Sequence, residues 1–197
     1  MQSKLIVILL ALLWWPACGH KAPVPTAKTP WESSLAEYFD DSLDFTLNPQ
    51  SLSGQWLFKY QDQLKVRMIR SEYVMGVSIV SVTKKTDPEG KECKDIYATV
   101  KAQVKGEWDK DTLTLRVCDN MAGFDSFKEE DSRIFERAFI AFLKLYTIPD
   151  GSTGIHWHLS PLSQGLKDGM DGILKESKEK KKKTESKKYL YETDQKP

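Results

Sequence analysis

Strict alternation of apolar and polar residues in the middle of the chain is the feature that most limits its fold. Between residues 96 and 105, one side of the chain carries only Ile, Ala and Val, and the other carries Tyr, Thr, Lys and Gln. A period of two residues is that of a β-strand with one buried face. Residues 112–117 alternate in the same way, residues 73–82 form a long run rich in β-branched residues, and Asp87-Pro88-Glu89-Gly90 is a typical turn. We therefore predict an antiparallel meander with one face in water.

Further strands are predicted on both sides of this meander. Trp56, Phe58 and Tyr60 alternate with more polar neighbours, as do apolar residues between 64 and 68. Residues 53–68 are therefore predicted to form strands, and residues 155–159 a final one. A bulge is expected at Gly76 in the strand that begins at Tyr73. The total is five to six strands.

Two helices are predicted around the sheet. A short one begins near Thr29, which can cap it, and ends near Asp41. A long one follows a capping box at Ser126 and Glu129, because apolar residues then recur at helical spacing between 134 and 146. The long helix is predicted to pack on the sheet, because its many aromatic residues would otherwise be exposed to water. The expected fold class is α+β, a curled antiparallel β-meander covered by one long amphipathic helix.

Charge and composition divide the chain into four parts. Of the 197 residues, the first 17 are predicted to be removed, 18–28 form a proline-containing tether, and 29–174 form one globular domain. Residues 175–197 carry nine basic and five acidic side chains and are predicted to be a disordered basic tail, either solubilising or bound to anionic lipid or glycan. The formal net charge of +1 indicates no nucleic-acid partner.

The first 19 residues resemble a bacterial lipoprotein signal peptide. Lys4 precedes the apolar run LIVILLALLWW, which is too short to cross a bilayer, and Ala17-Cys18-Gly19 follows Pro16. The resemblance implies cleavage before Cys18, fatty acylation of its thiol, including palmitate, and a permanent membrane anchor. Because Gly19 is not acidic, it also implies the outer membrane, facing the periplasm, in a host with two membranes. The alternative is an ordinary secretory signal that leaves Cys18 as a free thiol.

The two remaining cysteines, Cys93 and Cys118, are predicted to form a disulfide. Export places the chain in an oxidising compartment, and the count outside the anchor is even. The alternative is two unlinked buried thiols.

Gly54-Gln55-Trp56 resembles the Gly-x-Trp that opens the first strand of lipocalin-like barrels. The resemblance implies a partly closed barrel that holds a small apolar ligand in its mouth. Trp56, Phe58 and Tyr60 are the candidate ligand-binding residues on this hypothesis. The alternative is that Trp56 is an ordinary core residue.

Other motifs favour no catalytic chemistry. His156-Trp157-His158 places two imidazoles on one face of a strand, where they can chelate zinc or copper, but the plainer interpretation leaves both histidines in water. Asp40 and Asp41 are interpreted as acidic residues that simply lie at the end of a helix. No cofactor, no metal and no enzyme are predicted. The expected function is a lipid-anchored envelope lipoprotein that binds a protein or wall polymer; the alternative is a lipocalin-like carrier of a small apolar ligand.

Overall fold

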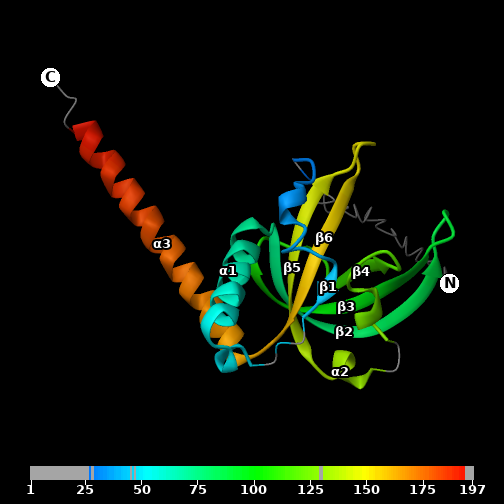
Figure 1. Cartoon of the computed structure of the whole chain (residues 1–197). Helices are drawn as coiled ribbons and strands as arrows, with labels where there is room; N and C mark the ends of the chain where they lie inside the picture. The colour runs from blue at the N-terminus through cyan, green and yellow to red at the C-terminus, as the bar shows by residue number, and fades with distance from the viewer. Residues whose placement is uncertain (1–26, 28, 45, 47, 129–130, 194–197) are drawn as a thin grey trace, which may run out of the picture.

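The chain folds into a curled, six-stranded mixed sheet shaped as a half-barrel, with its two longer helices on one side (Figure 1). The structure is a computed structural model that describes residues 27, 29–44, 46, 48–128 and 131–193. The strand order is β1-β6-β5-β2-β3-β4, and only the β1–β6 pair is parallel. The strands are β1 (Ser42–Leu43), β2 (Tyr73–Thr86), β3 (Glu92–Lys105), β4 (Thr112–Cys118), β5 (Ala138–Thr147) and β6 (Thr153–Pro161). The helices are α1 (Gly54–Arg70), α2 (Ser132–Phe135) and α3 (Gln164–Thr193), with 3-10 turns η1 (Ser33–Leu35), η2 (Pro49–Ser51) and η3 (Phe124–Ser126).

The β2–β3–β4 meander agrees with the alternation in the sequence. The turn after β2 closes through a hydrogen bond from the Gly90 amide to the Asp87 carbonyl, and Gly90 has a left-handed φ of 84°. The register between β2 and β3 shifts after Gly76, where a bulge is predicted. The α+β class and the curled sheet are therefore confirmed.

The prediction of a long helix over residues 134–146 is wrong. The segment instead supplies the short helix α2 and most of β5, which lies between β2 and β6. Phe139, Ala141 and Leu143 contribute to the core inside the half-barrel, while Ile140 and Phe142 contribute to the core under the helices. A central strand buried on both faces is a nearly continuous apolar run, which has no period of two to mark it.

The prediction of strands over residues 53–68 is also wrong, because this segment forms α1. Leu64 and Met68, one helical turn apart, are buried against Val74 and Phe142 of the sheet. The alternation from Trp56 to Tyr60 is thus a local coincidence within a helix whose buried stripe has a spacing of four. The sheet is covered by α1 and the first turns of α3 in place of one long helix. The short helix predicted after Thr29 is reduced to η1.

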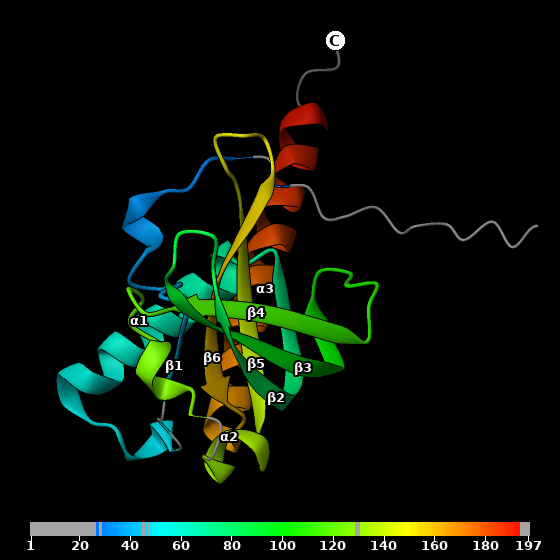
Figure 2. The same ribbon diagram turned by 90° about the vertical axis from the view of Figure 1, so that its right-hand side faces the viewer.

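The helix α3 continues well past the core that it helps to cover. Among the residues of α3 whose burial is described, Met170 is the last buried one; Ile173 and Leu174 are half-buried, and residues 175–180 are exposed. The helix extends to Thr193 and projects from the body (Figures 1 and 2), in a region where the sequence predicts disorder. Glu176 and Lys180 are spaced by four, an arrangement that favours a solvated helix.

Candidate functional site

The predicted anchor and the predicted disulfide differ in what the structure describes. Cys18 and the residues before it lie outside the described residues. Cys93 and Cys118 form a disulfide, as predicted, and face each other directly as a register pair of β3 and β4. The bond therefore fixes one end of the meander.

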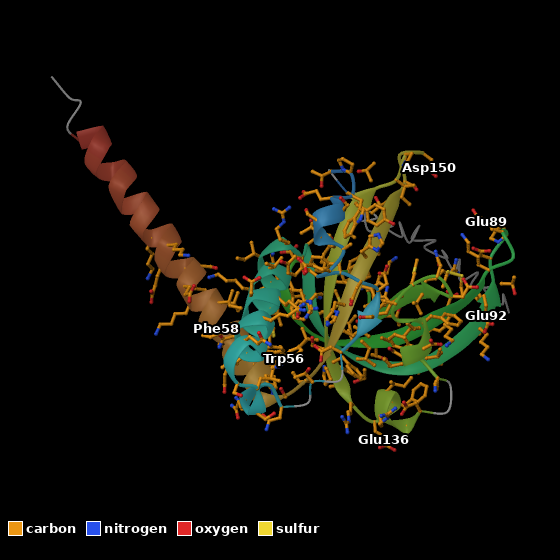
Figure 3. The ribbon with its side chains drawn as sticks, viewed as in Figure 1. Trp56, Phe58, Glu89, Glu92, Glu136 and Asp150 are labelled. Atoms are coloured by element: carbon orange, nitrogen blue, oxygen red, sulfur yellow. A yellow bond between two sulfur atoms is a disulfide. The ribbon has the colours of Figure 1, made fainter. Side chains whose placement is uncertain are left out.

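The three residues predicted to bind an apolar ligand lie on α1, outside the half-barrel. Trp56 and Phe58 are 64% and 72% exposed. Figure 3 shows them on the opposite side of the molecule from the hairpin that carries Glu89. Tyr60 is half-buried, and burial together with the nearby charge of Asp44 raises its pKa to about 12. Gly54 and Trp56 begin a helix, so the interpretation of Gly-x-Trp as the opening of a first strand is wrong.

Large side chains fill the inside of the half-barrel. Trp157 is buried there, its indole Nε1 donates to the Arg116 carbonyl at 3.2 Å, and Phe127 packs edge-on against its ring. The other large residues that are almost fully buried in this core are Met75, Ile96, Leu113, Leu115, Ile134, Phe139, Leu143 and Leu159. A carrier needs a cavity of several hundred Å³, and these side chains occupy the place where a lipocalin-like barrel would hold its ligand.

The most concentrated group of ionisable residues joins the N-terminal segment, residues 29–44, to strand β6. His158 is almost fully buried, with Asp40 at 2.9 Å from its Nδ1 and Asp44 at 3.4 Å from its Nε2. The Ser160 hydroxyl donates to Asp44 at 2.9 Å. Burial raises the pKa of both carboxyls, but the hydrogen bond and charge of His158 outweigh it, so both pKa values lie below the ordinary value.

Asp41 makes a second set of contacts with the same strand. Its carboxylate accepts a hydrogen bond from the Trp157 amide at 3.0 Å and lies 2.6 Å from Nδ1 of His156. The imidazole of His156 stacks on Tyr146 and also contacts Trp31. Burial raises the pKa of Asp41, although His156 opposes the shift. The residue has a left-handed φ of 52°, which Asp tolerates better than most residues.

A buried arginine lies close to these carboxylates. Arg67 of α1 donates from Nε to the Tyr38 carbonyl at 2.9 Å. Burial lowers its pKa, and the charges of Asp44 and Asp40 oppose that shift. The guanidinium therefore fixes α1 to the N-terminal segment and offsets part of the negative charge.

We call Asp40, Asp41 and Asp44 with His156, His158 and Ser160 the aspartate clamp. Nδ1 of His156 and both ring nitrogens of His158 face carboxylates, and among the described residues neither imidazole forms a hydrogen bond with a hydroxyl or thiol. Each imidazole is thus held by its own carboxylates, His156 by Asp41 and His158 by Asp40 and Asp44. The clamp closes β1 onto β6, together with backbone hydrogen bonds from the Asp41 and Asp44 amides to the Trp157 and Leu159 carbonyls.

This clamp was not predicted from the sequence. Both histidines were expected to be exposed to solvent, and Asp40 and Asp41 were interpreted only as residues at the end of a helix, whereas His158 and Asp41 are buried. The pairs are separated by about 115 positions, as in Asp41 and His156, and no local pattern marks such a contact. The available clue was the presence of two closely spaced histidines and three closely spaced aspartates in one chain.

Comparisons with protein-family models, curated proteins and solved structures found no match to this chain. Within the residues that the structure describes, none of the helices combines the length and the apolar character needed to cross a bilayer.

Proposed function

We propose that this chain is an exported lipoprotein, anchored through a lipid on Cys18, whose domain is a non-enzymatic binding module in the cell envelope. Two features support export. Residues 1–19 resemble a lipoprotein signal peptide, and the Cys93–Cys118 disulfide is a kind of bond that persists in oxidising compartments. In a host with two membranes, the resemblance favours the outer membrane, with the domain in the periplasm.

The observation that favours surface binding over ligand carriage is the filled half-barrel. Trp157 and Phe127 occupy its interior, so a partner is met by the outside of the domain. Trp56 and Phe58 offer two large exposed aromatic side chains on one end of α1. Aromatic residues of this kind are frequent energetic centres of protein interfaces. The partner is accordingly an envelope protein that docks on the Trp56 end of α1.

The aspartate clamp suits such an anchored module. It holds residues 29–44, which directly follow the predicted tether, on the edge of the sheet through side-chain and backbone bonds. A pull transmitted by the anchor therefore reaches β6 and the disulfide-linked sheet rather than a loosely attached end. The contacts of the clamp join β6 to the N-terminal segment, which supports a structural role for it.

The anchor is tested by replacing Cys18 with Ser and fractionating the native host. The expected result is release of the protein from the membrane fraction into the soluble envelope fraction. Cys93→Ser with Cys118→Ser is the matched control, because it also replaces cysteines but keeps the lipidated position and leaves the protein membrane-bound. A Cys18→Ser protein that stays in the membrane fraction refutes the lipid anchor.

The docking surface is tested by site-specific photo-crosslinking in the native host. A photoreactive amino acid replaces Phe58 in one strain and Glu89, at the exposed tip of the β2–β3 hairpin, in another (Figure 3). The expected result is one discrete crosslinked protein from position 58 and none from position 89. The same pattern of adducts, or none, at both positions contradicts docking at this end of α1.

A further inference from the structure

A groove of about 390 Å³ lies on the helix-bearing face of the sheet, beside the first turns of α3. Its floor consists of residues with little or no side chain: Gly76 of β2, Ala102 of β3 and Ala138 of β5. Gly76 and Ala102 are partners in the β2–β3 register, so these small residues are adjacent. The groove exists because the sheet is wider than the two helices that cover it.

The walls of the groove are apolar. Met170 of α3 and Ile140 of β5 form one side, and Val104 and Leu162 lie at its edges, each more than one third exposed. A Cβ added to Gly76 would meet only Ala102, at an ordinary contact distance of 3.6 Å. The space above Gly76 is therefore open to an apolar group from outside the domain.

The rim of the groove carries three charged residues. Lys101 comes from β3 and Lys167 from α3, so the two lysines reach the groove from different elements, and Asp171 follows Lys167 by one helical turn. Neither lysine forms a salt bridge with another described residue. The rim thus has a surplus of positive charge over an apolar floor, and Asp171 leaves one positive charge in excess.

We propose that this groove binds a free single-chain anionic amphiphile of the fatty-acid class. The hydrocarbon chain lies on the floor formed by Gly76, Ala102 and Ala138, and the carboxylate is bound by Lys101 or Lys167. Sites for small ligands have this composition, an apolar lining of a few hundred Å³ with a small number of placed polar groups. The inference rests on the proposed role of the domain as a binding module, but it does not depend on the lipid at Cys18.

The test is calorimetric titration of the mature chain carrying Cys18→Ser with sodium dodecanoate below its micellar concentration. Saturable binding of one dodecanoate is expected, together with binding of dodecyltrimethylammonium that is at least about tenfold weaker, because opposite charges at the rim favour only the anion. Absence of saturable dodecanoate binding overturns the proposal, and so does equal affinity for the cationic probe.

Substitutions in the groove test whether dodecanoate binds there. Gly76→Leu fills the floor and is expected to abolish binding, whereas Gly172→Ala, at an open position on α3, leaves it unchanged. Because Gly76→Leu can also disturb folding, a second comparison uses charge reversals at exposed lysines. Lys101→Glu with Lys167→Glu lowers dodecanoate affinity at least about tenfold, and Lys110→Glu in the exposed β3–β4 turn does not. Equal affinity of the double variant and Lys110→Glu overturns the proposal.

The outcomes separate this inference from the proposed function. Loss of dodecanoate binding with a specific crosslink at Phe58 removes the groove proposal and leaves the docking module in place. Saturable dodecanoate binding without a crosslink at Phe58 retains the groove and contradicts the protein-docking surface.

Discussion

Replacement of Asp41 tests how strongly the N-terminal segment is held to the sheet. The Asp41 carboxylate accepts from the buried Trp157 amide and contacts His156, and its backbone is left-handed. Asp41→Ala therefore removes the acceptor, and it also removes the short polar side chain that lets aspartate tolerate a left-handed backbone. Asp41→Gly removes the acceptor alone, and Asp41→Asn retains both an acceptor oxygen and tolerance of positive φ.

The contributions can be estimated separately. A buried amide left without an acceptor costs about 1–3 kcal/mol, and a left-handed alanine costs about 1–2 kcal/mol. We therefore expect Asp41→Ala to lower the free energy of unfolding by about 2–5 kcal/mol. Asp41→Gly should be about 1 kcal/mol more stable than Asp41→Ala, and Asp41→Asn should lie within about 1 kcal/mol of the wild type.

The assay is urea unfolding of the mature Cys18→Ser chain and its Asp41 variants, followed by tryptophan fluorescence and near-ultraviolet circular dichroism. The expected order of stability is wild type, Asn, Gly and then Ala. If Asp41→Ala unfolds within about 0.5 kcal/mol of the wild type, the clamp does not hold the segment. If Asp41→Asn is as unstable as Asp41→Ala, the hydrogen bond to the Trp157 amide is not the dominant contribution.

Three further predictions concern the clamp, the disulfide and the core. The pKa values of Asp40 and Asp44 are lowered from 3.8, so their stabilisation is present above that pH and is lost as the pH falls through their lowered values. Acid titration of the unfolding free energy should therefore show a smaller loss below about pH 4 in Asp40→Asn with Asp44→Asn than in the wild type, and an equal loss would contradict the contacts of both carboxylates with His158. Replacing Cys93 and Cys118 with Ala opens a loop with a sequence separation of 25 and should lower stability by about 3 kcal/mol in urea; no change would mean that the bond does not constrain the unfolded chain. Phe127→Ala should cost about 3–5 kcal/mol in the same assay, because it empties part of a packed interior, and a cost below about 1 kcal/mol would indicate a cavity there.

The sequence predicts correctly those strands that have one face exposed to solvent. The alternation from Ile96 to Lys105 indicates a strand because the polar side remains visible in the pattern, and the turn at Gly90 has its own residue preferences. The disulfide between Cys93 and Cys118 was predictable from the expected export and an even count of cysteines outside the proposed anchor. Each of these features depends on local sequence or on simple pairing.

The wrong predictions concern two segments. In one, burial on both faces hides the difference between a period of two and a period of 3.6 residues, and in the other the alternating run is too short to distinguish them. In β5, Phe139 and Phe142 fit a helical stripe equally well, because every second and every third residue is apolar. In α1, the spacing of Leu64 and Met68 competed with an apparent alternation from Trp56 to Tyr60. Tertiary packing, rather than local preference, decided both segments.

The clamp was not predictable because its two sides are distant in the chain. His156 and His158 have carboxylate partners from residues 40–44, and parallel pairing of β1 with β6 brings them together. A two-residue strand such as β1 leaves no recognisable period. Its position depends on the complete sheet, which a reading of neighbouring residues cannot supply.

The intact mass of the protein extracted from membranes of the native host is the sharpest test of the lipid anchor. We expect a chain that begins at Cys18 and carries the added mass of a diacylglyceryl group, with two hydrogens gained on reduction of the Cys93–Cys118 bond. A chain with an unmodified Cys18, or one that still begins at Met1, would contradict the proposal that this domain is an anchored envelope lipoprotein.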